Sequence, residues 1–452
     1  MPDRIHLTEG DPVPAECADQ IRGALHEPLP SPNANVEDIA PYFGLQNVGS
    51  TFQLGFFVGM ARLPNSEGPV LIIHPRFQDL DYASMFAVCA DDPEVYDLGA
   101  TFFVWPDKPP IDGEPAPHWF TPLLVIAFLS ALDRLCKRHL RRNYLREVKN
   151  LTGRMKGRLK LREHIRNNIL RYRPERVVCE YGLFDDDCLE NRILRAALEV
   201  SRAYMVQHSG FITPAILGWI RTCRAALARV SIARIHPRHF GVARQMGTFR
   251  HYRDPHRLAR AVLRHLGIDP ENLGHGSDRM RVPPFALCTY ELFERYAETI
   301  LRKSDPDLWS GGWGKERNLG LGRYKTRPDF IRPKAGVILD CKYKRFPDGR
   351  ISDQERADIY QIAAYSRHKG VLDKICHAGG PDKPQKLVLL YPDVEYAEPS
   401  WCGSESRDDQ SLHCDDFEVP LLVKRLYCPR LQSRTHAPLT VAQPLDESPE
   451  GL

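Results

Sequence analysis

Two acids and a lysine stand close together in the segment "TRPDFIRPKAGVILDCKYKR", residues 326 to 345. Asp340 and Lys342 are two positions apart in an apolar run, so strand alternation places both side chains on one face. A turn around residues 333–336 would form a hairpin and bring Asp329 beside Asp340. Two adjacent carboxylates repel each other unless a cation lies between them. Oxygen ligands of this kind suit Mg²⁺, and Lys342 would then lie beside a phosphodiester to be hydrolysed.

The same three residues would also suit an ordinary exposed strand that carries an ion pair. That alternative does not account for the apolar strand around them or for the ordered neighbouring elements. The pattern therefore favours a catalytic site.

A helix upstream supplies a third acid, in "FALCTYELFERYAETILRK" at residues 285–303. Apolar side chains recur there at helical spacing, at Leu292, Phe293, Tyr296, Ala297, Ile300 and Leu301. At about 100° per residue, Glu294 falls beside this stripe and Glu291 nearly opposite it. We predict Glu294 as the metal-binding acid, with Glu291 as its substitute. A simple ion pair of Glu294 with Arg295 or Arg323 is the alternative.

A second helix is predicted downstream, in "ISDQERADIYQIAAYSRHKG" at residues 351–370. Ser352 and Glu355 have the spacing of a capping box, and Gly370 closes the segment. Gln361 and Tyr365 are four residues apart and so lie one turn apart on the same side. Gln361 is either an ordinary polar position or a residue that orients DNA or water. Tyr365 suits core packing with its hydroxyl at the edge.

In this order, Glu294, Pro328-Asp329, Asp340-Cys341-Lys342 and the Gln361–Tyr365 helix resemble the PD-(D/E)xK nuclease superfamily and its RecB-like branch. The resemblance implies a restriction-endonuclease-like α/β core. The implied catalytic residues are Glu294, Asp329, Asp340, Lys342 and Gln361. The implied metal ligands are Glu294, Asp329, Asp340 and Cys341. DNA contacts are expected at Arg327, Lys344 and Tyr365, although Arg327 could instead pair with an acid.

A narrower resemblance is to the McrC family, the nuclease subunit of the McrBC modified-cytosine restriction system. It is carried by "LFERYAETILR", "RPDF", "VILDCKYK", "DIYQIAAYS" and "LVLLYP", with weaker agreement from "VLIIHPRF" onward, and spans about residues 45–428. It implies a Mg²⁺-dependent DNA endonuclease that defends against foreign DNA carrying 5-methylcytosine. It also implies a separate AAA+ GTPase partner of the McrB type, contacted by the N-terminal β-rich domain. The chain contains no GxxxxGK[ST] loop of its own.

Two other functions fit the same residues. A RecB-like DNA repair or processing nuclease would use the same chemistry with different partners. A non-catalytic regulator would use the fold to hold DNA or to stimulate the GTPase. All the expected acids and the lysine are present, which favours an enzyme.

The length of 452 residues predicts two or three domains. Composition predicts a flexible leader at 1–35, and short apolar runs between Pro, Gly and Asp predict a β-rich partner-binding domain at 36–120. A basic helical region follows at 121–280, with Ile193, Leu194, Ala197 and Val200 at helical intervals. The nuclease domain is expected at 281–430 and a disordered tail at 431–452. The expected fold class is thus a multidomain protein that combines α+β and α/β parts.

Charge is concentrated rather than spread. The net charge is only +4, but residues 137–176 hold fifteen Lys or Arg against three Glu. Three interpretations remain open for this stretch: contact with the DNA backbone, docking to an acidic protein, and a solvated helix face.

The sequence predicts a cytoplasmic location. Its first twenty residues are polar and acidic, unlike a secretory signal peptide. The twelve cysteines include no CxxC pair and are expected to be reduced thiols. The most apolar run, at 122–132, is about half the ~20 residues needed to cross a bilayer, so it is expected to be a core helix.

Overall fold

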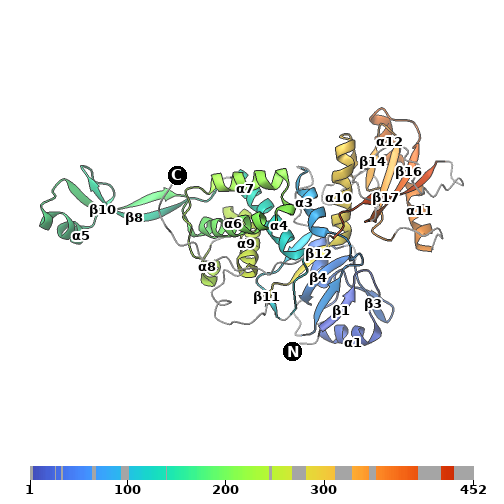
Figure 1. Ribbon diagram of the computed structural model, residues 1–452, viewed down its shortest axis with the longest axis horizontal. Helices are drawn as coiled ribbons and strands as arrows, with labels where there is room; N and C mark the ends of the chain where they lie inside the picture. The colour runs from blue at the N-terminus through green and yellow to red at the C-terminus, as the bar shows by residue number, and fades with distance from the viewer. Residues whose placement is uncertain are drawn as a thin grey trace. The chain divides into compact units, whose positions relative to one another are not determined.

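The computed structural model describes residues 4–25, 27–31, 34–63, 68–92, 101–112, 114–138, 140–243, 247–266, 281–310, 328–345, 353–394 and 419–431. It divides into two compact units (Figure 1). The first combines Met1–Leu123 with Val282–Leu452, and the second is Leu124–Arg281. The protein is a mixed α and β molecule with several sheets, as the sequence predicts.

A five-stranded sheet in the first unit has the order β1-β5-β4-β12-β6. Its strands are β1 (Arg4–Thr8), β4 (Phe57–Arg62), β5 (Val70–His74), β6 (Phe102–Val104) and β12 (Phe285–Cys288). β1 is parallel to β5, and the other pairs are antiparallel. Gly59 in β4 has φ +145°, and a Cβ atom there would lie 2.2 Å from the carbonyl oxygen of Phe285. A glycine is therefore required for β12 to pair so closely with β4.

The remaining elements of the N-terminal part surround this sheet. They are α1 (Ala15–Ala24), α2 (Val36–Ile39), η1 (Ala40–Tyr42), β2 (Gln46–Val48), β3 (Thr51–Gln53), α3 (Tyr82–Ala90) and β7 (Ile111–Asp112). The prediction of a loose leader at 1–35 is wrong for its described residues, because β1 is a sheet strand and Ile5, Leu7 and Ile21 are buried in the core. Pairing with a strand far along the chain, and not local composition, holds this segment in place.

A second five-stranded sheet, also in the first unit, has the order β13-β14-β15-β16-β17. Its strands are β13 (Trp309–Ser310), β14 (Phe330–Arg332), β15 (Val337–Cys341), β16 (Lys386–Asp393) and β17 (Leu421–Tyr427). β13, β14 and β15 pair antiparallel, whereas β15, β16 and β17 pair parallel. The helices α10 (Thr289–Ser304), α11 (Asp353–Tyr365) and α12 (Lys369–His377) accompany this sheet (Figure 1).

The second sheet and its helices differ in part from the predicted elements. The hairpin is confirmed: β14 and β15 pair antiparallel, and the turn between them ends at Gly336, whose φ is +64°. The single helix ending at Gly370 is wrong, because α11 ends at Tyr365 and α12 begins at Lys369 after the extended His368. The nuclease domain predicted at 281–430 is not separate from the N-terminal sheet, since the first unit resumes at Val282 and β12 belongs to that sheet. The tail from 432 onward lies outside the described residues.

The second unit is largely helical. Its helices are α4 (Phe120–Lys137, which begins in the first unit), α5 (Leu161–Asn167), η3 (Ile169–Arg171), α6 (Leu189–Gln207), η4 (Ser209–Phe211), α7 (Pro214–Ala226), α8 (Pro237–Val242), η5 (Gly247–Tyr252) and α9 (Arg253–His265). The short strand β11 (Arg281–Val282) crosses the boundary between the units. Ile193, Leu194 and Ala197 are fully buried on α6, as their helical spacing predicts. The apolar run at 122–132 is the buried part of α4, so the predicted core helix is confirmed. Within the described part of the chain, no helix combines the length and apolarity of a membrane span.

Among its described residues after α4, the basic stretch 137–176 folds mainly as strands and turns, with the short helices α5 and η3. β8 (Asn143–Thr152) and β10 (Arg176–Asp185) form a ten-residue antiparallel ladder, and β9 (Arg158–Leu159) pairs with β10. The interpretation of this stretch as one face of a helix is therefore wrong. Backbone hydrogen bonds between β8 and β10 hold the charged residues of these strands in an extended ladder. We call residues 143–185 the basic hairpin.

Candidate functional site

The β14–β15 hairpin brings the two predicted acids together. Phe330 pairs with Leu339, which places Asp329 and Asp340 at the next positions along the two strands. The Asp329 carboxylate accepts a hydrogen bond of 2.7 Å from the backbone N–H of Cys341. Asp340 is buried, with 2% of its surface exposed.

Glu294 reaches this pair from α10. Burial and the neighbouring Glu294 carboxyl raise the pKa of Asp329 well above its usual value, and the two side chains are hydrogen-bonded. Glu291 lies on the other side of the helix, buried, with Arg295 2.7 Å from its carboxylate. The structure thus places Glu294, and not Glu291, beside the hairpin acids.

Lys342 lies among these acids as their counter-charge. Its ammonium is 2.5 Å from Asp340 Oδ2 and donates to Gln361 Oε1 at 2.9 Å. Burial lowers the pKa of Lys342, but Asp340, Asp358 and Asp329 raise it by more, so the group stays charged. Burial and the charge of Asp329 together raise the pKa of Asp340 to about 7, against the opposing effect of Lys342.

Helix α11 supplies side chains that contact Lys342 and Lys344. Gln361 donates to the hydroxyl of the buried Tyr365 at 2.7 Å, and so the predicted Gln–Tyr pair forms one chain of hydrogen bonds with Lys342. Lys344, expected to contact DNA, has its ammonium 2.8 Å from the carboxylate of Asp358. Arg327 lies outside the described residues.

Burial disfavours a thiolate at Cys341, the fourth predicted metal ligand. Its side chain is fully buried, and burial followed by the charges of Asp329 and Glu294 raises the pKa of its thiol well above the usual value. A thiol that keeps its proton is a poor ligand. Its contribution in this structure is the backbone N–H that holds Asp329.

Two neighbouring residues were not singled out from the sequence. Asp358 is buried, lies 3.7 Å from the Lys342 ammonium and also holds Lys344. Its position three residues before Gln361, one turn away on the same helix, could have revealed it. Burial, followed by the charges of Asp329, Glu294 and Asp340, raises the pKa of Tyr290 far above its usual value. Its position one turn before Glu294 was the corresponding signal.

The donor atoms suit a hard divalent cation, because three carboxylates converge with mutual repulsion that a cation would relieve. In the part of the chain that the structure describes, no three His, Cys, Asp or Glu side chains are already arranged as a metal cage. Lys342 compensates Asp340, and the Cys341 N–H holds Asp329. The arrangement is therefore a charge-compensated acid cluster that fits Mg²⁺ by chemistry.

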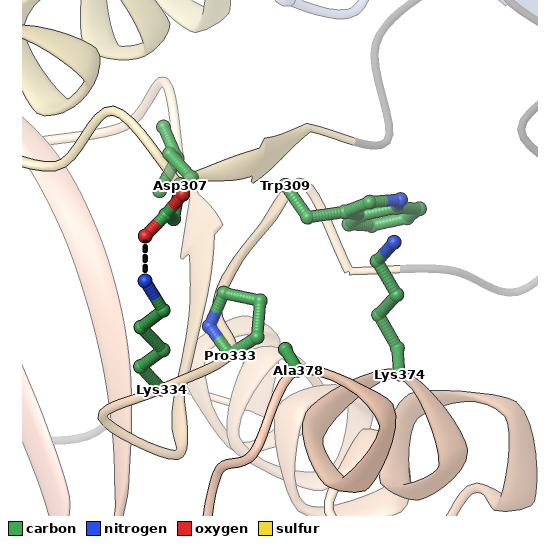
Figure 2. A pocket seen from close by; sticks show the side chains of 7 residues that line it. Asp307, Trp309, Pro333, Lys334, Lys374 and Ala378 are labelled. Atoms are coloured by element: carbon green, nitrogen blue, oxygen red, sulfur yellow. Dashed lines mark hydrogen bonds and ion pairs between the residues drawn. The ribbon is translucent and has the colours of Figure 1, made fainter.

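A pocket of about 340 Å³ lies beside the hairpin turn and contains none of these residues. It is lined by Asp307, Leu308, Trp309, Pro333, Lys334, Lys374 and Ala378. Figure 2 shows Lys334 paired with Asp307 and the ammonium of Lys374 pointing toward the Trp309 ring.

The fold and the site together define a mixed α and β protein with a buried acid–lysine cluster on a hairpin. A comparison with protein families matches residues 54–374 to the family described as "McrBC 5-methylcytosine restriction system component". The match covers more than half of the chain, and the chain belongs to this family.

Solved structures give two further likenesses, both from Thermococcus gammatolerans. One is a chain of the half-complex from the tetradecameric assembly of McrB AAA+ hexamers with bound McrC, at 15% identity and a TM-score of 0.39, covering 94% of each chain. The other belongs to the McrBC complex, at 16% identity and a TM-score of 0.31, covering 66% of this chain and 87% of that one. No curated protein matches the sequence.

Proposed function

We propose that this chain is the Mg²⁺-dependent endonuclease subunit of a modification-dependent restriction complex, cleaving DNA that carries 5-methylcytosine. The observation that carries the proposal is the convergence of Glu294, Asp329 and Asp340 with Lys342 on one hairpin and one helix. The motif order resembles the PD-(D/E)xK superfamily, and membership of a restriction-system family supports the same reaction.

The chain's own residues determine how hydrolysis would proceed. Mg²⁺, when bound, polarises the phosphodiester and lowers the pKa of a water molecule. Asp340 must lose its proton to hold a cation, and because burial and Asp329 raise its pKa to about 7, the cation and the proton compete there. The Lys342 ammonium neutralises negative charge that develops on the phosphate. Gln361 orients that ammonium, and Tyr365 in turn holds Gln361.

The partner in this proposal is a separate AAA+ GTPase of the McrB type. The family description names a restriction-system component, and the chain has no nucleotide-binding GxxxxGK[ST] loop. McrB AAA+ hexamers with bound McrC from Thermococcus gammatolerans are an example of such an assembly. Recognition of the modified base would belong to that partner, and the complex would act in the cytoplasm.

The decisive test is Asp340→Ala in a Mg²⁺- and GTP-dependent cleavage assay on methylated and unmethylated DNA, with the AAA+ protein added. We expect cleavage to be lost while DNA and partner binding persist. Asp382→Ala, at an exposed acid of the same unit, is the matched control and should cleave normally. Unchanged cleavage by Asp340→Ala would leave the regulator interpretation. Wild-type cleavage without GTP or methylation would indicate a RecB-like processing nuclease.

The assignment of the helix acid needs a second comparison. We expect Glu294→Gln to weaken Mg²⁺ binding about 10-fold or more, measured by titration calorimetry, since it removes a charge beside Asp329. Glu291→Gln removes the partner of Arg295, and it should lower the thermal midpoint while leaving Mg²⁺ affinity unchanged. The reverse result would transfer the metal-binding role to Glu291.

A further inference from the structure

A second buried carboxyl lies outside the acid cluster. Glu9 follows β1 directly and has 0% of its surface exposed. Its carboxylate accepts hydrogen bonds from the Thr289 hydroxyl, from the backbone N–H of Arg76 at 3.0 Å and from the Tyr343 hydroxyl at 3.1 Å. A buried acid with three donors is held in one position.

The donors to Glu9 come from the two elements that carry the acid cluster. Thr289 is the first residue of α10, the helix that carries Glu294. Tyr343 follows Lys342 immediately at the end of β15. The backbone of Thr289 is fixed as well, because its N–H donates to the Phe56 carbonyl at 3.0 Å. One carboxyl from the N-terminal sheet therefore joins the start of α10 to the end of β15.

Tyr343 is fixed on every side. Its hydroxyl lies 2.8 Å from the Tyr82 hydroxyl, which itself donates to the Phe77 carbonyl at 2.9 Å. Its ring packs against Phe56, Phe77 and Phe293 at centroid distances of 6.1, 5.0 and 5.9 Å. The preceding backbone is also held, since the Lys342 N–H donates to the Leu390 carbonyl at 2.8 Å. With Tyr343 and the Lys342 N–H both held, the Cα atom of Lys342 has little freedom to move.

Stability alone does not explain this network. Well-packed apolar side chains of the same volume often stabilise a core as much as buried polar groups do. A buried carboxyl with three matched donors instead specifies one relative placement of the groups that contact it. Here the groups are α10 and β15, and the site between them needs Glu294, Asp340 and Lys342 in register.

We propose that Glu9 and Tyr343 are positioning residues for the acid–lysine cluster, so that the N-terminal sheet forms part of the nuclease site. The inference rests on the proposed function. Neither residue contacts the reacting groups. They act by holding the start of α10 and the end of β15, and through these elements Glu294 and Lys342.

The test compares three hydroxyl or carboxyl substitutions with matched geometry. Tyr343→Phe and Glu9→Gln loosen the network and keep the packing volume. Tyr296→Phe is the control, because Tyr296 is equally buried on α10 but donates to the Tyr427 carbonyl at 3.1 Å and not to Glu9. For each protein we would measure Mg²⁺ affinity by calorimetry, the single-turnover cleavage rate with the AAA+ partner, and the thermal midpoint.

We expect Tyr343→Phe and Glu9→Gln to lose about 10-fold in Mg²⁺ affinity or cleavage rate, the usual range for residues that support metal ligands. Tyr296→Phe should keep wild-type values for both, even where its thermal midpoint falls by a similar amount. Wild-type Mg²⁺ affinity and rate in Tyr343→Phe and Glu9→Gln would overturn the positioning role. A wild-type protein that neither binds Mg²⁺ nor cleaves would instead overturn the proposed function itself.

Discussion

The acid cluster and the basic hairpin use charge in opposite ways. In the cluster, Asp340 is 2% exposed and Lys342 is 9% exposed, and each has fixed partners. In the basic hairpin, Lys156 and Arg158 are exposed, and large apolar side chains are exposed among them, including Tyr172 at 94%. A buried charge has a strongly perturbed pKa and a precise position. An exposed charge is screened by salt, and a single exposed ion pair contributes little free energy.

The same contrast appears in the direction of the pKa shifts. Burial raises the pKa of Glu9 and of Asp340 to about 7 each. In the hairpin, a hydrogen bond from Lys160 lowers the pKa of the half-buried Glu180. Desolvation dominates in the first region and ion pairing in the second. Burial therefore favours the protonated form of Asp340, whereas the ion pair with Lys160 favours the ionised form of Glu180.

The largest expected difference between the two regions comes from replacing one lysine in each. Lys342→Met should reduce cleavage at least about 100-fold, because it removes the ammonium that we propose to stabilise the developing charge. It should also lower stability by about 3 kcal/mol, since Asp340 loses its counter-charge in a buried site. Lys160→Met breaks the hairpin pair with Glu180 and should leave the thermal midpoint unchanged. If Lys342→Met and Lys160→Met had equal effects in cleavage assays and thermal melts, the contrast between buried and exposed charges would be wrong.

A smaller effect follows from the buried acid Glu9. Its folded-state pKa is about 7 against 4.5 for an ordinary Glu, so the folded state binds the extra proton between these values. Glu9 therefore lowers stability as pH rises from 4.5 to 7, by up to about 3 kcal/mol across the window. Denaturant unfolding across this pH range should show a shallower decline for Glu9→Gln than for the wild type. Parallel curves would mean that Glu9 titrates normally.

The smallest expected effect concerns the role of the basic hairpin. Exposed apolar residues such as Leu170 and Tyr172 among the charges favour a protein-docking surface over one that binds only phosphates. We expect Arg154→Gln, Arg158→Gln and Arg162→Gln combined to leave the salt dependence of DNA binding unchanged, measured by fluorescence anisotropy. If the hairpin binds DNA, the log–log slope should instead fall by about 0.9 for each phosphate that is no longer neutralised.

Several features of the site could be predicted because their causes are local. The turn at 333–336 and the alternation of β15 place Asp329 beside Asp340 and give Asp340 and Lys342 one face. Helical geometry alone distinguishes Glu294 from Glu291. Each of these relations spans at most a hairpin or one helical turn. The core helix at 122–132 could also be predicted, because a local apolar run specifies it.

The features that could not be predicted depend on partners distant in the sequence. The segment of β1 resembles a loose leader because its partner β5 lies far along the chain, and β12 joins the N-terminal sheet after the whole second unit. The ion pair of Lys342 with Asp358 and the hydrogen bond that joins Glu9 to Tyr343 are of the same kind.

The sequence by itself determined which residues carry acid, base and ammonium groups, and which local turns and helices bring some of them together. Only the tertiary structure decided which of these charges are buried. Burial sets the pKa of Asp340, and it depends on the packing of α10, α11 and the sheet around one hairpin. The physical reason is that residue type and short-range geometry are encoded locally, whereas desolvation is a property of the assembled core.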